Sequence, residues 1–190
     1  MDSVSPNHAP IAVARYTGTA QILHWLTLAL ILAVLPLAWV VGSMPRDDPS
    51  RAWLFVLHRS FGLTVLVAIL FRLVWRASHP PPPLPRGTSM VVEWAGHATH
   101  WLMYAVLLLM PVSGYLLSGN GRPVSYFGLF DIPGIPKSPA IGDAASTVHN
   151  LGQWALYALV ALHVLATVWH VAVRRDGLLG RMLPPQRTQT

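Results

Sequence analysis

Nine histidines and no cysteines make imidazole the main candidate for chemistry in this chain of 190 residues. Two of the histidines, His149 and His163, lie fourteen residues apart in one apolar stretch, which is two heptads. In a helix their side chains would point within roughly 40° of each other and lie roughly 21 Å apart along the axis. One helix would thus present two imidazoles on one stripe. Groups that can ionise or bind a metal are costly inside such a stretch and usually have a function.

Four apolar stretches must position these side chains. The sequence predicts membrane-spanning helices over about 20–41, 52–75, 91–117 and 147–173. Each is long enough to cross a bilayer, which takes about 20 residues of helix. The chain is 53% hydrophobic and only 11% charged, which is unusual for a soluble domain. We therefore predict an all-α membrane protein, a four-helix transmembrane bundle that forms a single domain over residues 1–190.

The connections between the predicted spans differ in kind. Residues 42–51 form a short polar loop. The next connection, 77–90, contains five prolines and should be an extended, stiff link. The longest connection, Ser118–Ser146, is rich in Gly and Pro, with aromatic residues between them. Because it exceeds the usual length of a connection, we predict that it is a cap or a functional loop.

An even number of spans puts both termini and the proline-rich link on one side of the membrane. That side carries eight arginines, and the other side carries five basic residues that are partly offset by four aspartates. Since basic residues accumulate on the cytoplasmic side, both termini are predicted to be cytoplasmic. This bias also explains the net charge of +6 without a nucleic-acid partner.

The predicted spans place four histidines at two depths. His24 and His163 lie in the inner halves of the first and last spans, and His58 and His149 lie near the outer ends of the second and last. Two pairs of equal depth, stacked across a four-helix bundle, match what two bis-histidine haems require. Each haem iron takes one imidazole on each face of the ring. Ligation would also offset the cost of placing imidazole in apolar surroundings.

Other roles for these four side chains remain open. A histidine inside a membrane often only hydrogen-bonds a neighbouring helix. A histidine-bound metal ion would need three or four ligands at one depth, often with carboxylates. Apart from Glu93 at the polar entry of the third span, the predicted spans contain no acid, which counts against such an ion. A non-redox transporter or sensor lined by histidines would be distinguished by an absorption spectrum without haem bands.

Further polar side chains are weaker candidates. His97 and His100 lie on one face near the inner end of the third span, where they could bond a haem propionate, hold a quinone oxygen or simply lie at the interface. Arg59 directly follows His58 and could pair with a propionate or anchor the helix at the outer surface. Arg72 can extend toward the interface. The remaining histidines are expected to take no part, with His170 at the interface and His8 and His79 in loops.

Several short motifs occur in an order and spacing typical of one family. They are Gln21-Ile22-Leu23-His24-Trp25, Leu57-His58-Arg59-Ser60-Phe61-Gly62, Arg72-Leu73-Val74-Trp75-Arg76, His97-Ala98-Thr99-His100, His149 with His163, and Leu178-Leu179-Gly180-Arg181-Met182-Leu183-Pro184. From Tyr16 to Pro184 the chain resembles the bacterial cytochrome b561 family. Members of that family are four-span, dihaem b-type cytochromes of the bacterial inner membrane.

The resemblance implies ligation of two haem b groups by His24, His58, His149 and His163, in agreement with the pairing by depth. It also implies electron exchange with ubiquinone. One branch resembles a superoxide oxidase, which passes an electron from periplasmic superoxide through haem to quinone, and other branches resemble haem subunits that serve partner oxidoreductases. We therefore expect transmembrane electron transfer, with lipid, quinone and either superoxide or a partner redox protein as partners. Outer cations that would attract a small anion are Arg46, Arg51, Arg59, Arg122 and Lys137.

Overall fold

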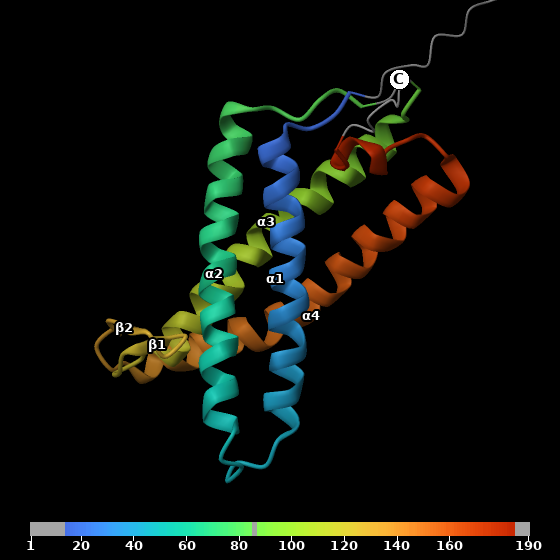
Figure 1. Cartoon of the computed structure of the whole chain (residues 1–190). Coiled ribbons are helices and arrows are strands. Elements are labelled where there is room, and N and C mark those ends of the chain that lie inside the picture. Colours follow the sequence, from blue (N-terminus) through green and yellow to red (C-terminus); the bar gives the residue numbers. More distant parts are fainter. Residues whose placement is uncertain (1–13, 85–86, 185–190) are drawn as a thin grey trace, which may run out of the picture.

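Four long helices dominate the computed structural model, which describes residues 14–84 and 87–184 (Figure 1). Each is long and apolar enough to cross a membrane. The elements are α1 Gly18–Ser43, α2 Arg51–Ser78, α3 Met90–Ser118, strands β1 Val124–Tyr126 and β2 Phe130–Ile132, α4 Pro139–Trp169, the π-helical turn η1 His170–Arg174 and the 3-10 turn η2 Leu179–Met182. The predicted fold class, a four-helix transmembrane bundle, is thereby confirmed.

Hydroxyl side chains set where three of these helices begin. The side chains of Thr17, Ser89 and Ser138 each accept a hydrogen bond from the backbone N–H three residues further on. Such caps satisfy N–H groups that have no partner inside the helix. After Ser138, Pro139 occupies the first turn of α4, where its missing N–H costs nothing. The fourth helix therefore begins well before the predicted start at residue 147.

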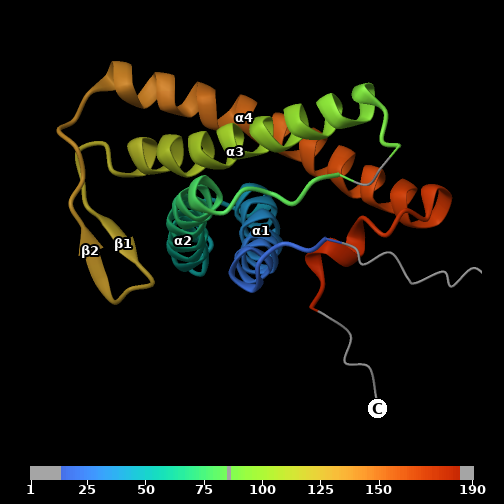
Figure 2. The same cartoon turned by 90° about the horizontal axis from the view of Figure 1, so that it is seen from above.

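The helices form two antiparallel pairs, α1 with α2 and α3 with α4. Seen from above, α1 and α2 are viewed nearly end-on while α3 and α4 run lengthwise, so the pairs cross obliquely (Figure 2). Packing between the pairs runs mainly through α2 and α3, whereas α4 makes only slight backbone contact with α1 and α2. The buried core lies where the pairs cross and includes Ile31, Ile69 and Leu107. Side chains, and not close helix packing, therefore bridge α4 to α1 and α2.

The bundle has two distinct ends. At one, which we call the terminal end, α1 and α3 begin and α2 and α4 finish (Figure 1). At the other, which we call the loop end, lie the connection between α1 and α2 and the connection between α3 and α4. A chain that crosses a membrane four times must have this arrangement, with both termini at one end.

The connection at the loop end between α3 and α4 is not the continuous loop that the sequence predicts. It contains a β-hairpin in which Tyr126 pairs with Phe130, and its last part belongs to α4. The hairpin is attached to α2, because the N–H of Phe127 donates to Ser60 Oγ at 2.7 Å. Tyr126 Oη also lies 3.0 Å from Thr64 Oγ1. Three-residue strands carry too little alternation to be read from sequence.

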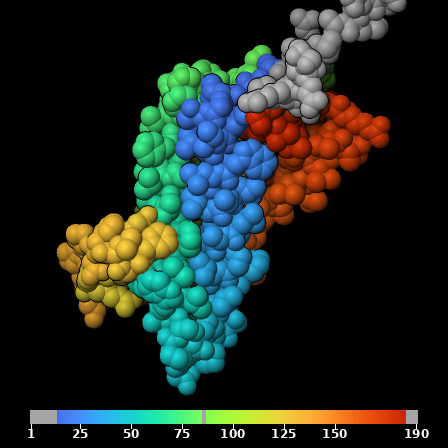
Figure 3. Space-filling view, viewed as in Figure 1, coloured from blue at the N-terminus to red at the C-terminus, as the bar shows by residue number. Residues whose placement is uncertain are grey.

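Arg181 ties three segments together at the terminal end. Its side chain, only 3% exposed, donates to the backbone carbonyls of Ala14, Pro82 and Pro83. The carbonyl of Arg181 in turn accepts from the N–H of Tyr16 at 3.1 Å. The tail around η2 therefore lies against the start of α1, as the space-filling view shows (Figure 3). We call this set of contacts the Arg181 clasp.

Replacing Arg181 by Met removes the guanidinium and keeps most of the side-chain length. We expect a loss of about 2 kcal/mol of stability, because the buried guanidinium and its hydrogen bonds to three carbonyls are lost. Thermal unfolding in detergent measures the loss, and limited proteolysis reports release of the tail. The control is Arg175→Met, since Arg175 is exposed and, among the described residues, its side chain donates to the nearby carbonyl of Ala172 alone. Equal melting temperatures for both variants would rule out a role for the clasp.

Candidate functional site

Two histidines face each other at the loop end, His58 from α2 and His149 from α4. Their ring centroids are 6.3 Å apart, and the ring planes make an angle of 87°. His58 Nδ1 lies 3.2 Å from the carbonyl oxygen of Val34, and His149 Nδ1 lies 3.0 Å from that of Met110. A carbonyl can only accept, so each Nδ1 carries the ring proton and each Nε2 keeps a free lone pair. Both rings of this loop couple are thus prepared to bind a metal through Nε2.

Helix α3 supports the His149 ring through a glycine. A Cβ atom built on Gly114 would lie 3.0 Å from His149 Cε1, so a larger residue at this position would crowd the ring. Glycine inside a helix costs about 1 kcal/mol relative to alanine, which indicates a packing reason for it. Ser113 Oγ also lies 3.2 Å from His149 Nδ1. Contacts with α3 therefore fix the orientation of this imidazole.

A second couple lies at the terminal end, His24 from α1 and His163 from α4. Its ring centroids are also 6.3 Å apart, with an angle of 61° between the planes. A third imidazole, His100 of α3, has its centroid 5.5 Å from that of His163. His100 Nδ1 lies 2.7 Å from the carbonyl of Gly96, which again leaves Nε2 free. The terminal couple thus has a neighbouring imidazole, which distinguishes it from the loop couple.

His24 differs from the other histidines in its hydrogen-bond partner. Its Nδ1 lies 3.0 Å from Arg72 Nη2. A guanidinium can only donate, so in this arrangement His24 Nδ1 accepts and the ring proton lies on Nε2. Arg72 was expected to extend toward the interface, and instead it contacts His24 and the ring of Tyr104, with its guanidinium carbon 5.4 Å from the centroid of that ring.

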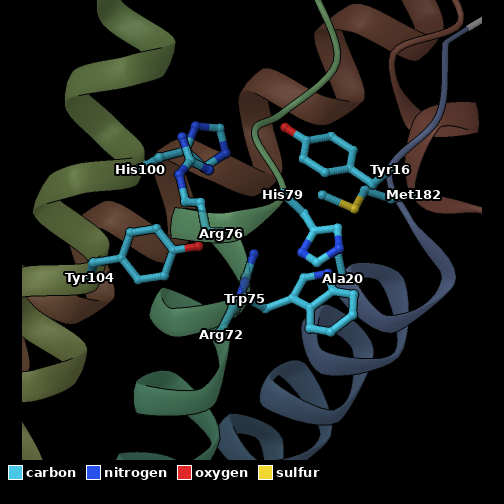
Figure 4. A pocket seen from close by; sticks show the side chains of 9 residues that line it. All are labelled: Tyr16, Ala20, Arg72, Trp75, Arg76, His79, His100, Tyr104 and Met182. Atoms are coloured by element: carbon cyan, nitrogen blue, oxygen red, sulfur yellow. The ribbon is translucent and has the colours of Figure 1, made fainter.

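Two adjoining cavities lead to the terminal couple. One lies between the helices and is lined by His24, His163 and neighbouring side chains. The other opens toward the end of the bundle, where Tyr16, Trp75, Arg76, His79 and Met182 contribute to its walls (Figure 4). Arg72, His100 and Tyr104 line both cavities. We call these two adjoining cavities the passage, which extends from the terminal couple toward Tyr16 and Met182 beside the Arg181 clasp.

Of the weaker candidates from the sequence, one lies inside the passage and the others lie elsewhere. His100 lies inside the passage, whereas His97 is exposed on the same helix. Arg59 is half-buried and donates from Nε to the carbonyl of Phe55 in its own helix. His170 lies 2.6 Å from Asp176. Burial acts to raise the pKa of Asp176, but hydrogen bonds from His170 and from the N–H of Leu178 outweigh it and lower that pKa.

Sequence reasoning missed several residues of the passage. His79, for which no part was expected, lines the outer cavity and stacks on Trp75 with ring centroids 4.0 Å apart. Tyr104 was not singled out. Arg76 was named only as the last residue of a motif, although a guanidinium near the end of an apolar run is a signal that could have given it a role. His8 lies outside the described residues.

Comparison with known proteins gives a consistent result over nearly the whole chain. A family model described as "Prokaryotic cytochrome b561" matches residues 15–185. Cytochrome b561 homolog 2 of Escherichia coli (strain K12) is 31% identical over 172 residues, which cover 89% of this chain and 91% of that protein. A protein of Yersinia pestis named "Probable superoxide oxidase CybB" is 29% identical over 87% of this chain and 93% of its own length. Cytochrome b561 homolog 1 of E. coli is 24% identical over 91% of this chain and 99% of its own.

The family match, the relatives and the four spanning helices all indicate a bacterial multi-pass membrane protein that binds b-type haem and transfers electrons. This chain therefore belongs to the prokaryotic cytochrome b561 family.

Proposed function

We propose that the chain carries electrons across the membrane between two b-type haems, one at each end of the bundle. His24 and His163 would hold one haem, and His58 and His149 would hold the other. The observation that carries this proposal is the equal spacing of the two imidazole couples, with ring centroids 6.3 Å apart in each. Membership of the family supports the type of haem, and the two couples support the number.

The spacing of the couples suits an iron porphyrin. A metal–imidazole bond is about 2.0 Å long, so two imidazoles on opposite faces of one metal have ring centroids about 6 Å apart. The angles of 61° and 87° between ring planes also suit it, because two rings on a common axis can rotate about that axis. At the terminal end a cavity lies between His24 and His163. The slight backbone contact of α4 with α1 and α2 favours a group held between these helices.

Bound haem supplies a one-electron iron couple. The chain supplies ligands whose orientation is already fixed, because the carbonyls of Val34 and Met110 hold the Nδ1–H groups of the loop couple. It also supplies distance, since His149 and His163 are separated by roughly 21 Å of helix rise. One helix thus sets how far an electron moves between the two ends.

We place ubiquinone exchange at the terminal end and assign that end to the cytoplasm, because most of the basic residues lie there. His100 supports this location. It lines both cavities of the passage, and its hydrogen bond to Gly96 leaves the Nε2 lone pair free to accept a hydrogen bond from a quinol hydroxyl. Since His97 is exposed, only His100 of this pair is suited to the role.

At the loop end we propose that superoxide is oxidised to oxygen. Arg59 follows His58 in α2, and Arg122 is close enough to it for the two positive charges to repel each other. Such a pair of cations attracts a small anion. Each superoxide that becomes oxygen gives up one electron, and two such electrons with two protons reduce one quinone to quinol. The name of the Yersinia pestis relative supports this substrate.

The alternative is a haem-carrying subunit that serves a partner oxidoreductase. The hairpin at the loop end favours it, because Leu129 and Phe130 near its turn are 78% and 57% exposed. Exposed apolar side chains at such a position suit either lipid or a docking protein. In this case electrons would enter from the partner, and superoxide would not reduce the protein rapidly.

Single replacements of the four ligands test the haem assignment. We expect two haems per chain in the parent and about one in each of His24→Ala, His58→Ala, His149→Ala and His163→Ala, because one remaining imidazole holds iron weakly. Haem extraction with protein quantification measures the ratio, and His97→Ala is the control that keeps both. A parent with one haem would sink the proposal, as would a His24 variant that keeps two.

Gly114→Ala tests the position of the His149 ring. The added Cβ would lie 3.0 Å from His149 Cε1, so the ring must shift. We expect partial loss of the haem at the loop end and a shift in its midpoint potential, with the other haem unchanged. Redox titration followed by absorbance measures both. The matched control is Gly96→Ala in the same helix, where a Cβ meets nothing within 4 Å. Identical titrations of the two variants would contradict the proposed ligand.

Arg122→Gln tests the attraction of superoxide. We expect haem reduction by superoxide to slow about tenfold at low salt and to depend less on salt, because one steering charge is lost. Stopped-flow absorbance measures the rate. The control is Arg175→Gln. Like Arg122, Arg175 is exposed and donates to a backbone carbonyl three or four residues earlier, but it lies at the terminal end. If superoxide reduces the parent no faster than it reduces free haem, the carrier alternative is preferred.

A further inference from the structure

Two arginines lie one turn apart near the terminal end of α2 without an acidic partner. Arg72 and Arg76 are both half-buried. Within the described chain, Asp176 is the only carboxylate that forms ion pairs, and its partners are His170 and Arg174. The charges of Arg72 and Arg76 are also close enough to repel each other. Two unpaired cations at this depth of a spanning helix therefore need an explanation.

Aromatic faces offset only part of this cost. The guanidinium carbon of Arg72 lies 5.4 Å from the centroid of the Tyr104 ring, and that of Arg76 lies 5.8 Å from it. Arg76 also lies 5.7 Å from the Trp101 ring. Cation–π contacts stabilise a cation less than a hydrogen-bonded anion does. Charged groups inside membranes are almost always paired, and an anion would complete the pairing of these two arginines.

Several hydrogen-bond donors line the cavity beside these arginines. In Figure 4, the side chains of Arg72 and Arg76 rise from α2 between Tyr104 on one side and Tyr16 on the other, and both phenol oxygens point into the space. His100 completes the polar wall, and none of the lining residues is acidic. Because Arg72, His100 and Tyr104 also line the cavity between His24 and His163, the two spaces adjoin. The anion site thus opens onto the terminal couple.

Metal binding at His24 would change the hydrogen-bond partner of Arg72. When an imidazole binds iron through Nε2, its Nδ1 carries the proton and donates. His24 Nδ1 could then no longer accept the hydrogen bond that Arg72 now donates at 3.0 Å. Arg72 therefore requires a new acceptor in the loaded protein, and the adjoining cavity is where its side chain can find one.

We propose that Arg72 and Arg76 bind the carboxylates of the haem held by His24 and His163, so that its propionate edge faces the cavity below the Arg181 clasp. This inference rests on the proposed haem site. Guanidinium groups are suited to carboxylates because their N–H donors match the two oxygens. The hydroxyl of Tyr16 is placed to donate to the same carboxylates. An anionic lipid headgroup is another source of the same chemistry, and the experiment distinguishes it.

The test compares haem with haem dimethyl ester, in which both carboxylates are neutral. Apoprotein carrying His58→Ala is reconstituted in nanodiscs of neutral phosphatidylcholine, so that only the terminal site is titrated, and binding is followed by Soret absorbance. We expect Arg72→Gln to weaken haem binding about tenfold or more and to leave binding of the ester nearly unchanged. Arg72→Lys should recover part of the loss, and Arg76→Gln should show the same selectivity. Arg175→Gln is the control and should change neither affinity.

The outcomes separate the possible roles of the two arginines. Selective loss for haem supports the proposal. Equal loss for haem and ester would mean that Arg72 only maintains the fold, and no loss for either would exclude contact with the carboxylates. Loss that appears only when anionic lipid is added would assign the arginines to a headgroup. If the chain with intact Arg72 and Arg76 binds neither compound, the haem site itself is wrong and this inference falls with it.

Discussion

The structure depends on one constraint, which is that imidazoles placed inside apolar helices must have partners. Helix α4 carries two of them, and it packs along α3 while making only slight backbone contact with α1 and α2. The gap is crossed by side chains at two levels, where His163 meets His24 and His149 meets His58 at the same 6.3 Å. Close packing of α4 on its neighbours would remove that spacing. The oblique crossing of the two helix pairs therefore serves the histidine couples.

The two ends of the bundle treat their couples differently. At the loop end, backbone carbonyls fix both rings in the tautomer that leaves Nε2 free, and the hairpin is bonded to α2 through Ser60 and Thr64, close to His58 in sequence. At the terminal end, arginines and a third imidazole surround the couple, and a passage leads to it. One end is thus covered by the hairpin, and the other is reached by adjoining cavities that arginines and His100 line. Different redox partners at the two ends are consistent with this asymmetry.

The elements that were predicted well from the sequence are those marked by long apolar runs. The four helices follow from apolar runs that no soluble domain would carry, and the helix ends differ from prediction where a local cap decides, as at Ser138. The hairpin was missed because its strands are three residues long. Its attachment uses the N–H of Phe127, a residue with φ of 51°, and non-glycine residues rarely adopt that conformation without tertiary support.

By itself the sequence determined the number of spans, the two heights on α4 and the pairing of four histidines by depth, because helix rise and rotation are fixed by the backbone. Only the tertiary structure decided which side chains surround each couple. Three features depend on how helices distant in sequence rotate and cross. They are the partial burial of His100 beside His163, the contact of Arg72 with His24 and the Arg181 clasp. Those angles follow from packing between helices, and no periodicity within one helix encodes them.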